Sequence, residues 1–152
     1  MITIRPYFDQ DWEAICRVHD RAQPSEFVGT FDFPVKSSLA ENYKIQMLLP
    51  QCLKFVACDG ETVVGFLIIQ GHAINLLYVD PDCQNQGIGG RLLQLALDIM
   101  GSPVWTVTIA GNMRARRFYQ RAGFQLVDQF EGKVKDHPCQ FVRLKWGEDT
   151  SS

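Results

Sequence analysis

Short apolar runs separated by turn residues divide the start of the chain into a strand, a helix and a loop. Residues 2–5 alternate apolar and polar side chains, which is the pattern of an edge strand. Residues 9–22 follow a helical period, and one side of that helix carries Trp12, Ile15, Val18 and His19. Two prolines and a glycine then interrupt the pattern between residues 23 and 34. We therefore expect a strand and a helix to open the fold, followed by a loop.

The loop at residues 23–34 combines aromatic and acidic side chains, namely Phe27, Phe31, Phe33, Glu26 and Asp32. Two interpretations stay open. The segment can form a lid over an acceptor-binding site, or its rings can complete the hydrophobic core, since long loops pack their own aromatic residues. A second helix is predicted after it, capped by Ser37 or Ser38 and ended by Pro50, with an apolar stripe of Leu39, Tyr43 and Met47.

The middle of the chain predicts antiparallel strands. Residues 53–58 and 61–70 are rich in β-branched and aromatic side chains and are joined by Asp59-Gly60, a strong hairpin signal. Residues 72–79 supply a further strand after Gly71. Up to this point the chain offers a meander of about four strands with two helices inserted early.

The second half alternates helices and strands. A helix is predicted at residues 87–100, with a buried face of Ile88, Leu92, Leu95, Ala96 and Ile99. A strand at residues 104–109 follows, and then a helix at residues 113–122 that Asn112 caps and Gly123 ends. This alternation implies parallel neighbours.

The chain closes with two strands, at residues 124–130 and 140–146. A polar hairpin loop joins them and contains Gly132, Lys133, Lys135, Asp136 and Pro138. We expect a single α+β domain over residues 1–147 and a polar C-terminal tail at residues 148–152.

Composition narrows the class of protein. The 152 residues are 46% hydrophobic, enough for one domain that buries roughly 70% of the surface of its unfolded chain. The net charge of −2 argues against nucleic acid as the main partner. No apolar run approaches the roughly 20 residues that a membrane helix needs. Five cysteines without a C-x-x-C pair favour reduced thiols, a cytoplasmic location and no metal cage.

Residues 74–91 contain the features that predict a binding site for an anion. An apolar strand ends at Asp80-Pro81, a short polar loop follows, and Gly87, Gly89 and Gly90 stand where a helix begins. The first N–H groups of a helix have no partner inside it, and the peptide dipoles add partial positive charge there. Such a terminus binds phosphate groups, so we expect a pyrophosphate-bearing cofactor at the mouth of a split sheet.

The spacing of the glycines identifies the type of phosphate loop. A dinucleotide fingerprint would need glycine at Leu92, and a P-loop would need G-K-S or G-K-T. The chain instead has Q-x-x-G-x-G at residues 84–89 and N-x-x-A-x-x-F-Y-x-x-x-G-F at residues 112–124. The two motifs, in this order and spacing, resemble those of the GNAT superfamily of acetyl-CoA-dependent N-acetyltransferases, and within it the small bacterial stand-alone type.

The resemblance implies a fold and a co-substrate. The fold would be a central, mostly antiparallel, twisted sheet of about 6–7 strands, splayed after strand 4 and flanked by about 4 helices. Acetyl-CoA would bind with its pyrophosphate on the loop and its arm along the strand edge, with no metal. The residues implied in cofactor binding are Leu77, Tyr78, Val79, Gln84, Asn85, Gln86, Gly87, Ile88, Gly89, Gly90, Arg91 and Asn112.

The resemblance also implies a general acid but gives no clear base. Tyr119 falls on the tyrosine that protonates the departing thiolate in this family. Many members place Glu or His on the strand before Val79, where this chain has Ala73 and Asn75. Strand alternation puts His72 and Tyr78 on the opposite face unless a bulge redirects them. His72 is a weak candidate for the base, and Asp80, a water chain or the loop at residues 23–34 are the alternatives.

The remaining functional expectations concern the partners. Four arginines on one helix can meet a CoA phosphate or form a solvated face: Arg114, Arg116, Arg117 and Arg121. The expected activity is direct attack of a primary amine on acetyl-CoA in a ternary complex, and the acceptor can be a small molecule or a peptide. Glu26 and Asp32 hint weakly at a cationic acceptor. A non-catalytic acyl-CoA-binding module is the alternative, with a regulatory nucleotide binder a distant third. Monomer and homodimer both stay open.

Overall fold

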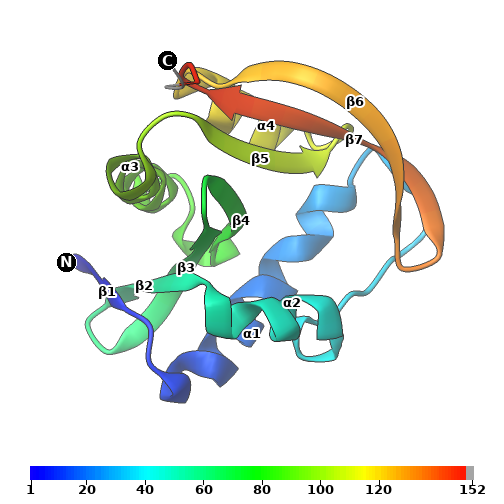
Figure 1. The fold of residues 1–152 in the computed structure, drawn as a ribbon. Helices are drawn as coiled ribbons and strands as arrows, with labels where there is room; N and C mark the ends of the chain where they lie inside the picture. The colour runs from blue at the N-terminus through cyan, green and yellow to red at the C-terminus, as the bar shows by residue number, and fades with distance from the viewer. Residues whose placement is uncertain (150–152) are drawn as a thin grey trace.

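One seven-stranded sheet organises the protein, in the order β1-β2-β3-β4-β5-β7-β6 (Figure 1). A computed structural model describes residues 1–149; residues 150–152 of the predicted tail lie outside the described residues. The strands are β1 (Ile2–Pro6), β2 (Leu53–Asp59), β3 (Thr62–Gln70), β4 (Ala73–Val79), β5 (Val104–Ile109), β6 (Gln125–Val134) and β7 (His137–Trp146). The α-helices are α1 (Trp12–Ala22), α2 (Tyr43–Leu48), α3 (Ile88–Met100) and α4 (Met113–Arg121).

The predicted mixed, mostly antiparallel sheet is confirmed. Strands β1 to β4 form an antiparallel meander, and β5, β7 and β6 form a second antiparallel group. The two groups meet where β4 and β5 run parallel. The predicted hairpin turn is displaced by one residue, because Asp59 pairs with Thr62 and leaves Gly60 and Glu61 as the turn.

Helices cover both faces of the sheet. α1 packs on β3 and β4 from one face, around Val18, Val56 and Phe66. α3 packs on the same two strands from the other face, around Leu67, Ile88 and Leu92 in a cluster that α4 joins. Gly65 permits this contact: a Cβ atom there would lie 3.1 Å from the Tyr78 carbonyl oxygen and 3.4 Å from side-chain atoms of Ile88 and Leu92. The molecule therefore has two cores that share one sheet.

A third, smaller core joins the early loop to the last hairpin. Buried Phe27, Val35 and Ile109 pack together, and the partly buried residues around them are Phe31, Val134, Cys139 and Phe141. Phe31 and Phe33 also lie against the ring of His137, with centroids 5.8 and 4.9 Å apart. The rings of the loop at residues 23–34 thus help to complete a core, in agreement with the second of the two interpretations of that loop.

Three local predictions were wrong. The second helix is only α2, capped by Asn42, and Tyr43 and Met47 are 74% and 77% exposed instead of buried. Helix α3 buries Leu93 and Leu97, whereas Ile99 is exposed. The polar hairpin loop is mostly strand, because β6 and β7 continue to a tight turn at Lys135 and Asp136. Polar residues fit these long strands because one face of the hairpin tip meets solvent, while the other face packs in the third core.

The five cysteines are free thiols. No helix within residues 1–149 has both the length and the apolar character needed to cross a bilayer. Nor do the described residues contain a group of three or more His, Cys, Asp or Glu side chains arranged to hold a metal ion.

Candidate active site

The central opening of the sheet lies between β4 and β5. These strands pair only at Ala73 with Trp105 and at Ile74 with Thr106, and then diverge. The Asp80 N–H donates to the Val64 carbonyl on β3 at 2.8 Å. Because N–H and C=O directions alternate along a strand, the backbone groups of Val79 and Leu77 point the other way, into the opening. Within the described residues, this edge of β4 therefore has no neighbouring strand beyond Ile74, and an extended ligand can pair with it.

A bulge in β4 decides which side chains face which side of the sheet. Ile68 pairs with Leu76 and Ile69 with Ile74, so Asn75 is the extra residue. Ile74 packs in the α3 core, whereas Leu76 and Tyr78 pack against the α1 core. A bulge in this strand, which the sequence analysis left open, is thus present. Tyr78 faces α1.

The N-terminus of α3 presents its free N–H groups beside this edge. Gly87 is the N-cap, with a left-handed φ of 79° that suits glycine. The Arg91 N–H already donates to the Gly87 carbonyl at 3.1 Å, which makes it the first amide used inside the helix. The amides of Ile88, Gly89 and Gly90 therefore precede the helical hydrogen bonds and remain available to an anion.

Gly89 packs tightly against α4. A Cβ atom at this position would lie 3.3 Å from Phe118 Cε1 and 3.7 Å from Val79 Cγ2. Glycine therefore lets the start of α3 approach α4 closely and keeps side-chain atoms away from the free amides.

A cavity of about 470 Å³ extends from this terminus to the end of α1. The predicted site residues that line it are Leu77, Tyr78, Val79, Gln84, Asn85, Gly87, Ile88, Gly89, Gly90, Asn112 and Tyr119. Arg114 and Arg121 of α4 line it as well. Gln86 is not among its lining residues, and the Arg91 guanidinium donates to the Ile2 carbonyl at 2.9 Å, toward β1. The cavity thus joins most of the predicted residues but not these two side chains.

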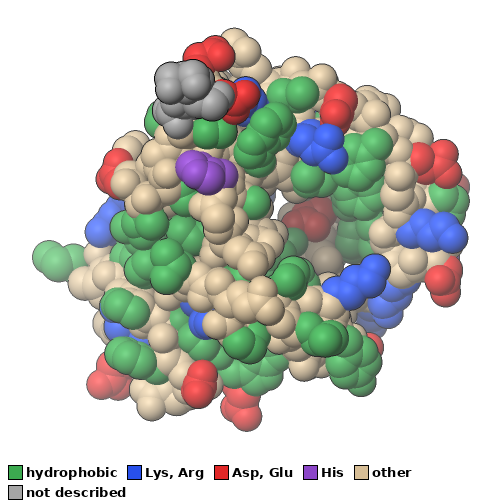
Figure 2. Space-filling view, in the orientation of Figure 1, with side chains coloured by type: hydrophobic (Ala, Val, Ile, Leu, Met, Phe, Trp, Pro, Cys, Tyr) green, Lys and Arg blue, Asp and Glu red, His purple; other side chains and the backbone are tan. Residues whose placement is uncertain are grey.

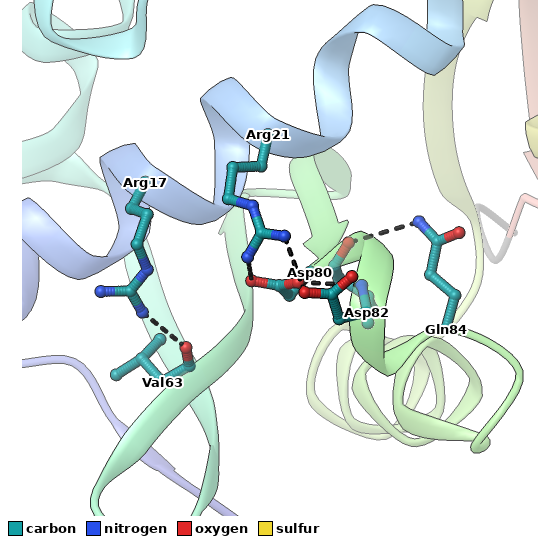
Figure 3. Close-up of polar contacts among 7 residues, drawn as sticks. Arg17, Arg21, Val63, Asp80, Asp82 and Gln84 are labelled. Carbon is teal, nitrogen blue, oxygen red and sulfur yellow. Dashed lines mark hydrogen bonds and ion pairs between the residues drawn. The ribbon is translucent and has the colours of Figure 1, made fainter.

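The loop between β4 and α3, called the phosphate loop below, is fixed to α1 by two ion pairs that form a clamp (Figure 3). Arg21 of α1 donates to Asp80 Oδ2 and Asp82 Oδ2, each at 2.8 Å. Asp80 is 6% exposed, and its Oδ1 also accepts the Asp82 N–H at 2.9 Å. In the same view, Gln84 reaches back to donate to the Val79 carbonyl at 3.4 Å. Asp80, one of the alternative candidates for the base, is therefore a turn former held by an arginine and not a free carboxylate.

His72 lies apart from the cavity. It stands in the turn before β4, at the opposite end of the strand from Val79, and its Nδ1 is 2.7 Å from the Pro103 carbonyl oxygen. Since it does not line the cavity, the geometry gives no support to His72 as the general base.

Tyr119 is 7% exposed and lies on the cavity wall. Its ring contacts Phe118 and Phe124 edge to face, with both centroid distances 5.1 Å. Tyr119 is the buried residue of α4, whereas Ala115, Phe118 and Ala122 are only partly buried. Burial raises the pKa of its phenol to about 12, so the hydroxyl stays protonated at neutral pH and can donate a proton.

Glu26 lines the cavity at the end of α1. It lies in a short 3-10 helix, η2 (Gln23–Phe27), that continues α1. Burial raises the pKa of its carboxyl group to about 7, and a hydrogen bond with Tyr78 partly opposes this effect. Burial and the neighbouring carboxylate of Glu26 hold the pKa of Tyr78 well above its ordinary value. From the sequence, Glu26 was a weak hint of a cationic acceptor, and the loop at residues 23–34 was one alternative source of the base; no local pattern singled out Glu26 within that loop.

Known proteins with similar sequences and folds fit this geometry. Residues 12–124 match the family model described as the acetyltransferase (GNAT) family. The chain is 30% identical over 147 residues to peptidyl-lysine N-acetyltransferase YjaB of Salmonella typhimurium, covering 95% of this chain and 97% of that relative.

Two solved structures show the same fold. Apo YjaB from Escherichia coli is 24% identical with a TM-score of 0.72, and the match covers 96% of this chain and 97% of that one. A GNAT acetyltransferase from Elizabethkingia anophelis, solved with acetyl-CoA bound, is 17% identical with a TM-score of 0.66, covering 95% and 97%. The splayed sheet, the glycine-rich helix start and the family match together assign this chain to the GNAT superfamily of acetyltransferases.

Proposed function

We propose that this chain transfers an acetyl group from acetyl-CoA to a primary amine of a polypeptide, with both substrates bound together. One observation supports this proposal most strongly. A single cavity joins the N-terminus of α3, the unpaired edge of β4 and the buried hydroxyl-bearing ring of Tyr119. These are the parts needed to hold a phosphate, an amide-containing arm and a thioester in one line.

The donor side fits acetyl-CoA by its chemistry. The free amides of Ile88, Gly89 and Gly90 suit the pyrophosphate. The backbone groups of Leu77 and Val79 can pair with the amides of the pantetheine arm, as a neighbouring strand would. Asn112 and the guanidinium groups of Arg114 and Arg121 line the same cavity, and guanidinium binds phosphate well. A relative with this fold has been solved with acetyl-CoA bound.

Transfer would proceed by direct attack. The amine nitrogen forms a bond to the thioester carbonyl carbon, and collapse of the tetrahedral intermediate breaks the carbon–sulfur bond. Tyr119 would donate its proton to the departing sulfur, a role that suits a phenol kept protonated by burial. No residue of the cavity then needs to form a covalent acyl intermediate.

The acceptor we favour is the side chain of a lysine. A relative that matches nearly its whole length is named a peptidyl-lysine N-acetyltransferase. A lysine side chain is long and unbranched, so it can enter a cavity while the polypeptide stays outside. The cavity reaches Glu26, whose carboxylate would attract the ammonium group.

Initial rates of acetylation test the proposal. Acetyl-CoA and a lysine-containing peptide are varied together, thiol release is followed, and the product is identified by mass spectrometry. A ternary complex predicts intersecting double-reciprocal lines and one acetyl group on the lysine nitrogen. Parallel lines would indicate an acyl-enzyme, and acetyl-CoA binding without turnover on peptides or other amines would favour a non-catalytic acyl-CoA-binding module.

A further inference from the structure

The protein lacks a proton acceptor on β4, the strand that lines the opening. The side chains along that strand are alanine, asparagine, tyrosine and aliphatic residues. The bulged Asn75 has a buried Oδ1 atom without a hydrogen-bond partner among the described residues, and an amide does not take up a proton at neutral pH. An ammonium acceptor must nevertheless lose a proton before it can attack.

Glu26 is the carboxylate of the cavity. Within the described part of the chain, it is the single Asp or Glu side chain that lines the cavity, and Tyr78 and Tyr119 line it too. Figure 2 shows a hollow near the centre of this face of the molecule, with acidic atoms visible inside it. Glu26 therefore lies with the general acid in one space that an amine can reach.

Neighbouring contacts fix the segment that carries Glu26. Phe27, the next residue, is 5% exposed and packs in the third core. The Ser25 hydroxyl donates to the Ala22 carbonyl at 2.8 Å, which ties η2 to the end of α1. Arg21, one helical turn earlier, holds Asp80 and Asp82 of the phosphate loop. The position of Glu26 is therefore coupled structurally to the site of the donor phosphates.

The electrostatic environment suits proton transfer. Burial raises the pKa of Glu26 to about 7, so a large part of the carboxyl groups is ionised at neutral pH and still basic enough to accept a proton. The carboxylate of Glu26 also raises the pKa of Tyr119, after the larger effect of burial. The base and the acid thus have well-separated pKa values in one cavity.

We infer that Glu26, supplied by the segment after α1 in place of a residue on β4, is the proton acceptor for the attacking amine, an inference that rests on the proposed function. Tyr78 lines the same cavity as Glu26.

The proton transfers balance in this scheme. Glu26 takes one proton from the ammonium group and releases it to solvent, and the neutral nitrogen then attacks the thioester carbonyl carbon. As the carbon–sulfur bond breaks, the sulfur takes the proton of Tyr119. The nitrogen loses its second proton to Glu26, and this proton restores the Tyr119 hydroxyl. The products are the amide, the thiol of CoA and one proton.

The pH dependence of kcat/KM in wild type and Glu26→Gln tests the inference. In wild type, a limb in the profile should rise through a pH of about 7, as Glu26 ionises. In Glu26→Gln, kcat/KM at pH 7 should fall about 10²–10⁴-fold, the range for loss of a general base, and the limb should disappear. Glu26→Asp should keep a limb with a reduced rate, because a carboxyl group remains.

Two further variants sharpen the test. Tyr78→Phe removes an interaction that lowers the pKa of Glu26, so the limb should move to higher pH. Asp32→Asn, an exposed acid in the same loop and outside the cavity, should leave the profile unchanged. Acetyl-CoA affinity and thermal unfolding, measured for each variant, establish that fold and donor site are intact.

The possible outcomes distinguish a failure of the inference about Glu26 from a failure of the proposed function. Wild-type turnover with an unchanged rate and limb in Glu26→Gln would overturn the role of Glu26 and leave the acetyltransferase proposal standing. Acetyl-CoA binding by wild type without turnover on any amine would overturn the proposed function, and the role of Glu26 with it.

Discussion

The two sides of the cleft are built from different parts of the polypeptide. The proposed donor side is mostly backbone: the first amides of α3 and the unpaired edge of β4 at Leu77 and Val79. The proposed acceptor side is mostly side chain, with Glu26 from η2 and Tyr78 from the far face of β4. Tyr119 lies on the wall where the two sides meet.

This difference explains why the proposed donor side can be recognised from the sequence. A backbone site requires glycine and fixed spacing, because any Cβ at Gly89 would meet Phe118. A side-chain site can be assembled from segments far apart in the chain, so its residues show no local pattern. The donor-side motif is therefore the part of the site that can be recognised from the sequence.

The largest expected effect comes from the residue that both sides share. Tyr119→Phe should lower kcat about 10²–10⁴-fold, because the departing thiolate loses its proton donor, and should leave the Kd of acetyl-CoA nearly unchanged. Steady-state kinetics and calorimetric titration measure the two effects. Tyr43→Phe, which alters an exposed tyrosine of α2, is the matched control. A wild-type kcat in Tyr119→Phe would remove this residue from the mechanism.

A change on the backbone side should act on binding instead. Gly89→Val should weaken acetyl-CoA binding by about tenfold or more, corresponding to about 1.4 kcal/mol or above, because its side chain crowds Phe118 and the free amides of α3. Titration of each variant with acetyl-CoA measures the loss, and circular dichroism checks that the fold persists. An unchanged Kd in a folded variant would mean that the phosphates bind elsewhere.

The smallest of these effects concerns the clamp between the two sides. Arg21→Ala leaves the buried Asp80 without its guanidinium partner and should lower the free energy of unfolding by about 1–3 kcal/mol. Thermal unfolding measures this loss, at roughly 2–4 °C per kcal/mol for a domain of this size. Arg143→Ala breaks a more exposed pair with Asp128 and should cost at most about 1 kcal/mol. Equal losses in both variants would show that the clamp has no special role.

Much of the fold was predictable because its signals are local. The apolar strands, the helix that follows Gly87 and the cap at Asn112 each follow from a few neighbouring residues. The exposed stripe of Tyr43 and Met47 was not predictable, because periodicity alone does not say whether a helix finds a partner. The length of β6 and β7 was also missed. Polar residues at a hairpin tip are predicted to form a loop when the strand with which they pair is not known.

The acceptor side was the least predictable part of the site. The face of Tyr78 depends on one bulged residue, Asn75, that strand alternation cannot reveal. Glu26 and Tyr78 are far apart in the chain, and only the packing of α1 on β4 brings them to one cavity. Long-range contacts of this kind leave no trace in the residues next to Glu26.

A crystal structure with CoA bound tests the central claim most directly. We expect the pyrophosphate on the amides of Ile88 and Gly89, the pantetheine arm along Leu77 and Val79, and the sulfur about 3–3.5 Å from the Tyr119 hydroxyl, in the same space as Glu26. CoA bound outside the opening between β4 and β5, or a sulfur separated from Glu26 by the sheet, would contradict the account.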